Sequence, residues 1–69
     1  MNTATARALA YDAATKHDWA EAARLYQLAI DLYPQPHTGE LAKHDLNMLS
    51  KMAGNYRRAA EHAAIPSSI

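Results

Sequence analysis

The fold of this chain follows from the stretch DWAEAARLYQLAIDLYP, which covers residues 18–34. Asp18 and Glu21 have the spacing of a capping box, with an aspartate in place of the usual serine or threonine. Pro34 predicts the end of the helix, because the residue before a proline disfavours the α-helical region. We therefore expect a helix over residues 19–33.

This helix is apolar on more than one side. Three leucines broaden an apolar face that recurs at helical spacing. The face comprises Trp19, Ala22, Ala23, Tyr26, Ala29, Ile30 and Tyr33, and the leucines are Leu25, Leu28 and Leu32. A helix with so broad an apolar face must pack against neighbours on more than one side, and the rest of the chain is expected to supply them.

A shorter helix is predicted before this stretch, over residues 3–16. Its apolar face is narrow, and Asn2, Thr3 and Thr5 are all candidate N-cap residues. The face follows the i, i+3, i+4, i+7 spacing and comprises Ala6, Leu9, Ala10 and Ala13. A face of such small side chains cannot hold a helix in water alone, so it must lie against a larger partner.

A longer helix is predicted after the stretch, over residues 38–64. Alanine is frequent, valine and phenylalanine are absent, and β-structure is poorly supported. We therefore predict an all-α fold, a three-helix antiparallel hairpin with a long third helix, in one domain of residues 1–69.

The long helix carries two lines of apolar residues, so one of them is available to a second chain. One line is a heptad seam of Ala42, Leu46, Leu49, Ala53, Tyr56, Ala60 and Ala63. Beside it lie Leu41, Met48, Met52 and Ala59. We predict a homodimer through this helix, with an interface made of Leu41, Met48, Leu49, Met52, Tyr56 and Ala59.

Size and composition also favour self-association. The chain has 69 residues and no cysteine, and a core in so small a domain rarely supplies more than about 3–5 kcal/mol without further support. Seven basic and seven acidic residues balance, which argues against general nucleic-acid or membrane-surface binding. No apolar run approaches a membrane span and no signal peptide is evident, so a cytoplasmic protein is expected.

The opening stretch resembles the second half of a tetratricopeptide repeat. The matching residues are Trp19, Ala22, Tyr26, Ala29 and Pro34, with Leu9 and Ala10 at the corresponding positions of the preceding helix. The aromatic residues that such repeats place near Ala6 and Ala13 are missing. The resemblance implies a helix-turn-helix hairpin, and a single repeat does not make a peptide-binding solenoid.

The same part of the chain is similar to small bacterial and phage regulators of the AraC-negative-regulator type. The similarity rests on Ala10, Asp18-Trp19, Ala22-Ala23, Leu25-Tyr26 and Ala29. It implies a short, all-helical protein that binds a transcription factor. In size and alanine content the chain is also similar to the phage anti-quorum-sensing proteins that inhibit LuxR-type regulators.

No arrangement of residues in the sequence predicts an enzyme. No serine, histidine and acid occur at a suggestive spacing, and the two glycines form no phosphate-binding loop. His37, Glu40 and His44 would share one face of a helix that began at Pro36, a possible set of three metal ligands. Surface polar residues near a helix cap are the preferred interpretation, so no cofactor or metal is expected.

The remaining candidates are surfaces for binding. Arg7, Tyr11 and Tyr33 are predicted to contact a protein partner, whereas Tyr26 is expected in the core. The alternative is a direct DNA-binding regulator that uses the polar side of the long helix, with Lys43, Lys51, Arg57 and Arg58 as candidate contacts. We expect a non-enzymatic inhibitor of a host transcription regulator, and a structural adaptor is the third possibility.

Overall fold

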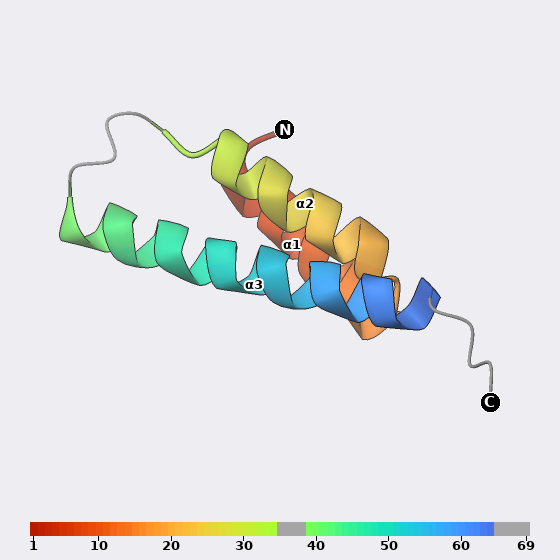
Figure 1. Cartoon of the computed structure of the whole chain (residues 1–69). Helices are drawn as coiled ribbons and strands as arrows, with labels where there is room; N and C mark the ends of the chain where they lie inside the picture. Colours follow the sequence, from red (N-terminus) through yellow and green to blue (C-terminus); the bar gives the residue numbers. More distant parts are fainter. Residues whose placement is uncertain (35–38, 65–69) are drawn as a thin grey trace.

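The computed structural model describes residues 1–34 and 39–64 and shows an all-α protein of three helices (Figure 1). The helices are α1 (Thr3–Thr15), α2 (Trp19–Asp31) and α3 (Glu40–Ala64). No strand occurs in the described residues. The predicted all-α class and its three helices are therefore confirmed.

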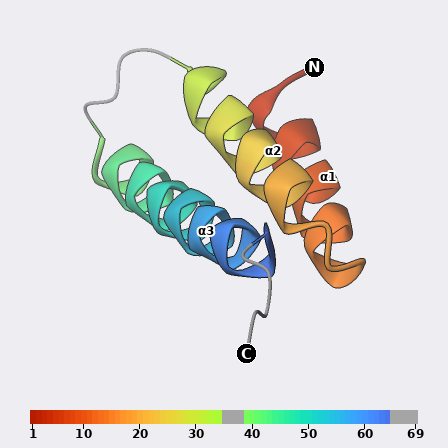
Figure 2. The same cartoon turned by 45° about the vertical axis from the view of Figure 1, so that its right-hand side comes forward.

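Helix α2 is central to the molecule. It packs against both α1 and α3, whereas α1 and α3 have few direct contacts. Figure 2 follows the chain down α1, back along α2 and down again along α3. A hydrogen bond from the Thr3 hydroxyl to the carbonyl oxygen of Ala29, 2.9 Å long, ties the start of α1 to the last turns of α2.

The contact between α1 and α2 is made largely by alanine. Ala6 and Ala10 of α1 and Ala22 and Ala29 of α2 have no exposed surface. Side chains this small let the two backbones approach closely, so a short helix with little apolar surface still finds a complementary neighbour. Leu9, expected on the packing face of α1, is instead 43% exposed, because the contact with α2 is confined to the alanine line beside it.

Well-formed caps define both ends of α1. The Asn2 side chain accepts a 2.8 Å hydrogen bond from the Thr5 amide, so Asn2 is the N-cap among the three candidates. At the other end, the His17 amide donates to Ala14 and the Asp18 amide donates to Ala13. This pair of bonds is a Schellman motif, and it places His17 in the left-handed region with φ of 60°.

The predicted capping box at the start of α2 does not form. Asp18 precedes the helix, but its side chain makes no capping hydrogen bond. A capping box also needs the backbone N–H of Asp18, and that group is already donated to Ala13 in the Schellman motif. The Glu21 carboxylate instead accepts two hydrogen bonds from Arg24, of 2.7 and 2.8 Å, which lower the pKa of Glu21.

Helix α2 ends earlier than the sequence predicted. Its last helical residue is Asp31, two residues before the predicted end at Tyr33. The Tyr33 amide donates to Ile30, a tighter bond than the α-helical pattern, as the chain approaches Pro34. The predicted start of the third helix at Thr38 lies outside the described residues, and the Gly39 carbonyl accepts the first described helical bond of α3 from Lys43.

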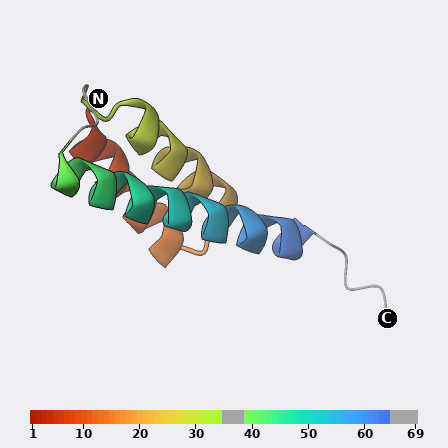
Figure 3. The same ribbon diagram turned by 60° about the vertical axis from the view of Figure 1, so that its left-hand side comes forward.

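Helix α3 is about twice as long as either neighbour, with 25 residues against 13 (Figure 3). Its heptad seam faces α2, since Leu49 and Ala53 are buried in the core with Leu25 and Tyr26. Leu49 was expected in the dimer interface, but the structure places it inside the single chain. Outside this contact, Leu41 is 81% exposed and Met48 is 48% exposed.

We predict that the alanine contact between α1 and α2 does not tolerate a larger side chain. The change Ala10→Leu should destabilise the fold by about 1–3 kcal/mol, because Ala10 is fully buried and a larger side chain would have to push neighbouring groups aside. Each kcal/mol lowers the melting temperature of a domain this size by about 4–8 °C. Thermal unfolding followed by circular dichroism measures the effect.

The control is Ala8→Leu, the same substitution at an exposed position of the same helix. Because helix propensity changes equally in the two variants, their difference isolates packing. Equal melting temperatures would show that α1 is not packed on α2 as described.

Candidate functional site

A groove runs between α1 and α3, across the surface of α2, because α2 holds its two neighbours apart. It consists of two adjoining hollows that share Tyr26 and Met52, and we call it the α1–α3 groove. The first hollow, of about 310 Å³, is lined by Arg7, Tyr26, His44, Asp45, Met48, Leu49 and Met52. The second, of about 400 Å³, is lined by Tyr11, Ala14, Thr15, His17, Trp19, Tyr26, Met52 and Tyr56.

Four stacked rings form one wall of the second hollow. His17 stacks on Trp19 with ring centroids 5.0 Å apart, and Trp19 stacks on Tyr56 at 5.6 Å. Tyr56 stacks in turn on Tyr26 at 5.5 Å, with an interplanar angle of 5°. Each such pair contributes about 0.5–1.5 kcal/mol beyond its buried area, so the ladder fixes α3 against α2 and fixes the wall of the groove.

The first hollow carries a positive charge at its edge. Arg7 is exposed, and no carboxylate among the described residues lies within ion-pair distance of its guanidinium. Burial raises the pKa of Tyr26 and the hydrogen bond to Asp45 raises the pKa of Tyr33, and the charge of Arg7 offsets a small part of both shifts. A cation beside methionine and tyrosine side chains suits a partner that is apolar and carries a carboxylate.

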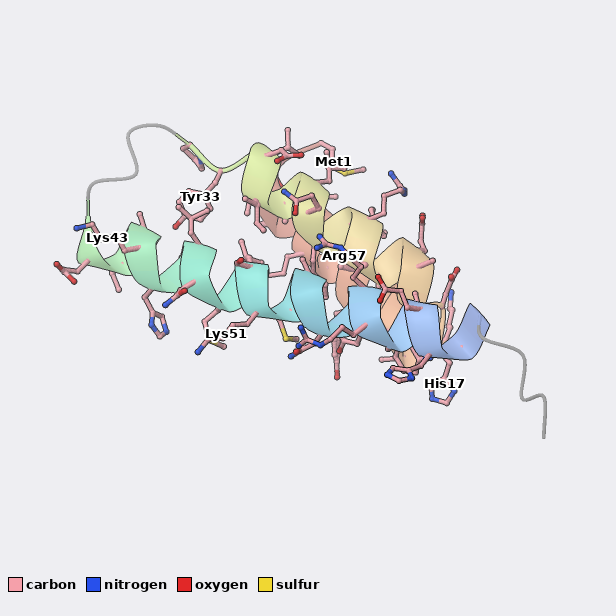
Figure 4. The ribbon with its side chains drawn as sticks, viewed as in Figure 1. Met1, His17, Tyr33, Lys43, Lys51 and Arg57 are labelled. Atoms are coloured by element: carbon pink, nitrogen blue, oxygen red, sulfur yellow. The ribbon has the colours of Figure 1, made fainter. Side chains whose placement is uncertain are left out.

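Tyr33 fastens the end of α2 to the start of α3 (Figure 4). Its hydroxyl donates a 2.9 Å hydrogen bond to Oδ2 of Asp45. That bond, to a group that is itself negative, is the main cause of the raised pKa of Tyr33. Tyr33 was predicted to contact a partner together with Arg7 and Tyr11. The structure brings Arg7 and Tyr11 to the α1–α3 groove and gives Tyr33 this bond to Asp45.

The residues predicted for the dimer interface fall into different environments. Leu41 and Met48 are exposed, and Met52 and Ala59 are half-buried. Tyr56 is half-buried within the ring ladder, and Leu49 is in the core. Met48, Met52 and Tyr56 also line the α1–α3 groove, so the predicted dimer surface and the predicted partner surface overlap.

The residues proposed for DNA binding do not form one line. Lys51 and Arg58 are exposed and lie two helical turns apart, on one side of α3. Arg57 lies on the side that faces α2, as Figure 4 shows, and Lys43 lies at the far end of the helix. The Arg58 guanidinium donates a 2.6 Å hydrogen bond to Asn55.

Arg57 belongs to a separate groove between α2 and α3, which we call the α2–α3 groove. Its volume is about 680 Å³. Its floor is made of small side chains and its edges carry charges of both signs. The lining residues are Ala20, Ala23, Arg24, Gln27, Leu28, Asp31, Arg57, Ala60 and Glu61. No aromatic ring lines this groove, so it offers a partner less rigid apolar surface than the α1–α3 groove does.

The possible metal set of His37, Glu40 and His44 falls partly outside the described residues, because His37 is not among them. Within residues 1–34 and 39–64, no group of three histidine or acidic side chains is arranged to hold a metal ion. None of the three described helices has the length and apolar character of a membrane span.

No protein family model, no curated protein and no solved structure matches this chain. Its function is therefore inferred from the grooves, rings and charges of the chain itself.

Arg7 and Tyr11 were predictable as surface candidates, but the wall of stacked rings was not. Trp19 and Tyr26 were assigned to packing, and His17 was not assigned to any site. One available signal was the pair His17 and Trp19, two residues apart across a turn. Their meeting with Tyr56, 37 positions after Trp19, depends on how α3 aligns with α2, and a pattern within one helix does not contain that information.

We predict that the pKa of the Tyr33 phenol lies above the ordinary tyrosine pKa of about 10. The change Asp45→Asn should lower the pKa of Tyr33 toward that ordinary value. The folded-state pKa exceeds the unfolded-state pKa, so the contribution of this group to stability is complete below about pH 10 and disappears as the pH rises through the raised value. Tyrosinate absorbance measures the titration, and urea midpoints at rising pH measure the loss of stability.

Tyr33→Phe assigns the titration, since burial also raises the pKa of Tyr26. Asp12→Asn, on exposed α1, is the matched control and should leave the titration unchanged. A titration in the Asp45→Asn variant identical to that of the wild type would contradict the hydrogen bond.

Proposed function

We propose that this protein is a non-enzymatic, protein-binding regulator, and that it inhibits a transcription regulator by binding one of the regulator's helices. The observation that carries the proposal is the α1–α3 groove, in which a rigid aromatic wall, two methionines and an uncompensated arginine converge. Tyrosine, tryptophan and arginine are the residues most enriched among binding hot spots, and methionine adapts to irregular apolar partners.

We further propose that the antiparallel three-helix chain forms a homodimer through α3. The support is the exposed apolar surface of Leu41 and Met48, together with a core that is mostly alanine. Because Met48 and Met52 also line the α1–α3 groove, a dimer and a complex with a partner would compete for this surface. Dissociation of the dimer would then accompany binding of the partner.

Direct DNA binding through α3 is the second candidate, and Lys51 and Arg58 on one exposed side of the helix favour it. The zero net charge and the position of Arg57 in the α2–α3 groove count against it. If several cations contacted phosphates, binding of purified protein to DNA would weaken steeply with added salt.

Affinity capture from host extract with three versions of the protein tests the regulator proposal. These are the wild type, Tyr11→Ala, which removes an exposed ring of the groove, and Arg57→Ala, which alters the other groove. We expect the wild type and Arg57→Ala to retain a transcription regulator that Tyr11→Ala loses. The same dependence must appear with purified components, and added protein must reduce transcription by that regulator.

The proposed function would be overturned if the regulator were captured equally well by the Tyr11→Ala variant. It would also be overturned if the protein changed transcription only by binding DNA. A purified protein that shifts DNA with a steep salt dependence would establish the second candidate instead.

We predict that the wild type is dimeric at micromolar concentration and that Leu41→Glu and Met48→Glu shift it to a monomer. Either change places a charge where the interface would remove it from water, which should weaken association at least tenfold. Light scattering measures the mass, and the melting temperature of the wild type should rise with protein concentration.

Ser50→Glu is the control, because it adds the same charge on an exposed position two residues from Met48, on another side of α3. The proposed dimer is rejected by a monomeric wild type whose melting temperature is independent of concentration.

A further inference from the structure

We infer that the α1–α3 groove selects a partner helix that carries an aromatic side chain and a carboxylate one turn apart. The inference rests on the proposed protein-binding function and names the chemistry that the groove recognises. It depends on three features, namely the aromatic hollow, the arginine beside it, and the distance between them.

The aromatic hollow has a wall of stacked rings, and a further, exposed ring also lines it. Tyr11 is 58% exposed on α1, and it lines the same hollow as His17, Trp19 and Tyr56. The lining contains no charged carboxylate or ammonium group, so a charged side chain that entered would lose water without finding a partner. A flat apolar ring meets aromatic and methionine surface on several sides, which makes it the complementary occupant.

The positive charge of Arg7 lies in the adjoining hollow. Arg7 has no ion-pair partner among the described residues, and His44 lies across from it on α3. Asp45 also lines this hollow, but its Oδ2 accepts the hydrogen bond from Tyr33. No carboxylate of the described residues lies within ion-pair distance of the Arg7 guanidinium, so a carboxylate of the partner can form a bidentate ion pair with it.

The spacing between Arg7 and Tyr11 determines how far apart the acidic and the aromatic residue of the partner must be. Arg7 and Tyr11 are four residues apart on one helix, about 6 Å along its axis. The groove lies between two helices and over a third, which is the setting in which an amphipathic helix docks. A partner helix that lies along α1 can place an aromatic residue beside Tyr11 and an acidic residue beside Arg7. This requires that the two residues of the partner be three or four positions apart.

A second copy of this chain does not supply that pair. Its aromatic residues are Tyr11, Trp19, Tyr26, Tyr33 and Tyr56. None of them has an aspartate or glutamate three or four positions away in either direction. The paired recognition therefore points to a helix of another protein, while self-association can use only the methionine surface of the groove.

The test uses the full chain and a fluorescein-labelled, alanine-rich helical peptide with one tryptophan and one glutamate four residues apart. Both chain orders of the two residues are made, because either orientation of the helix can occupy the groove. A control peptide of the same composition places the two residues two positions apart, on different faces. Fluorescence anisotropy measures affinity, and circular dichroism confirms that each protein variant is folded.

We expect at least one order of the four-residue peptide to bind about tenfold more tightly than the control peptide, with a similar loss on Tyr11→Ala. Arg7→Glu should weaken binding about tenfold, and exchanging the glutamate of the peptide for lysine should restore it to that variant. Arg57→Glu, in the α2–α3 groove, should bind as the wild type does.

Absence of binding, equal binding of the control peptide, or failure of the charge exchange to restore affinity would overturn the inference. If Tyr11-dependent capture of a regulator nevertheless succeeds, the protein-binding function stands and only the aromatic-acidic partner class falls. If the peptide binds as expected and no regulator is captured, the recognised chemistry stands and the regulator proposal falls.

Discussion

The whole structure depends on α2 having to pack against two neighbours at once. Its alanines meet the alanines of α1 at close range, and on another side the rings of Trp19 and Tyr26 stack on Tyr56 of α3. These two contacts are made by different kinds of side chain, small against small and ring against ring. Because neither contact brings α1 onto α3, the space between those helices stays open above Tyr26.

The open groove explains how a chain with an alanine core can still offer a rigid surface. An alanine contact contributes little apolar area per residue, so stability depends on close packing over the full length of α1. The larger side chains are concentrated elsewhere. Trp19, Tyr56 and Tyr26 stack between α2 and α3, and the half-buried rings of Trp19 and Tyr56 give a partner ordered surface without a further loss of side-chain freedom.

Much of the fold could be predicted from patterns within single helices. Periodicity located the three helices, and Asn2 was among the proposed caps. The capping box was wrong because two neighbouring elements shared a group. The Asp18 amide serves the end of α1, so it was lost to the start of α2. The site was predictable for Arg7 and Tyr11, which share one helix face, but not for the wall formed by residues far apart in sequence.

The ring ladder also gives the molecule a built-in optical reporter. Trp19 is the only tryptophan of the chain, and it lies between His17 in the first turn and Tyr56 on α3. Its emission therefore senses whether the third helix is in place, separately from the helical content that the two shorter helices already provide. A comparison of tryptophan emission with helical content during unfolding distinguishes the detachment of α3 from the unfolding of α1 and α2, without any dye or engineered probe.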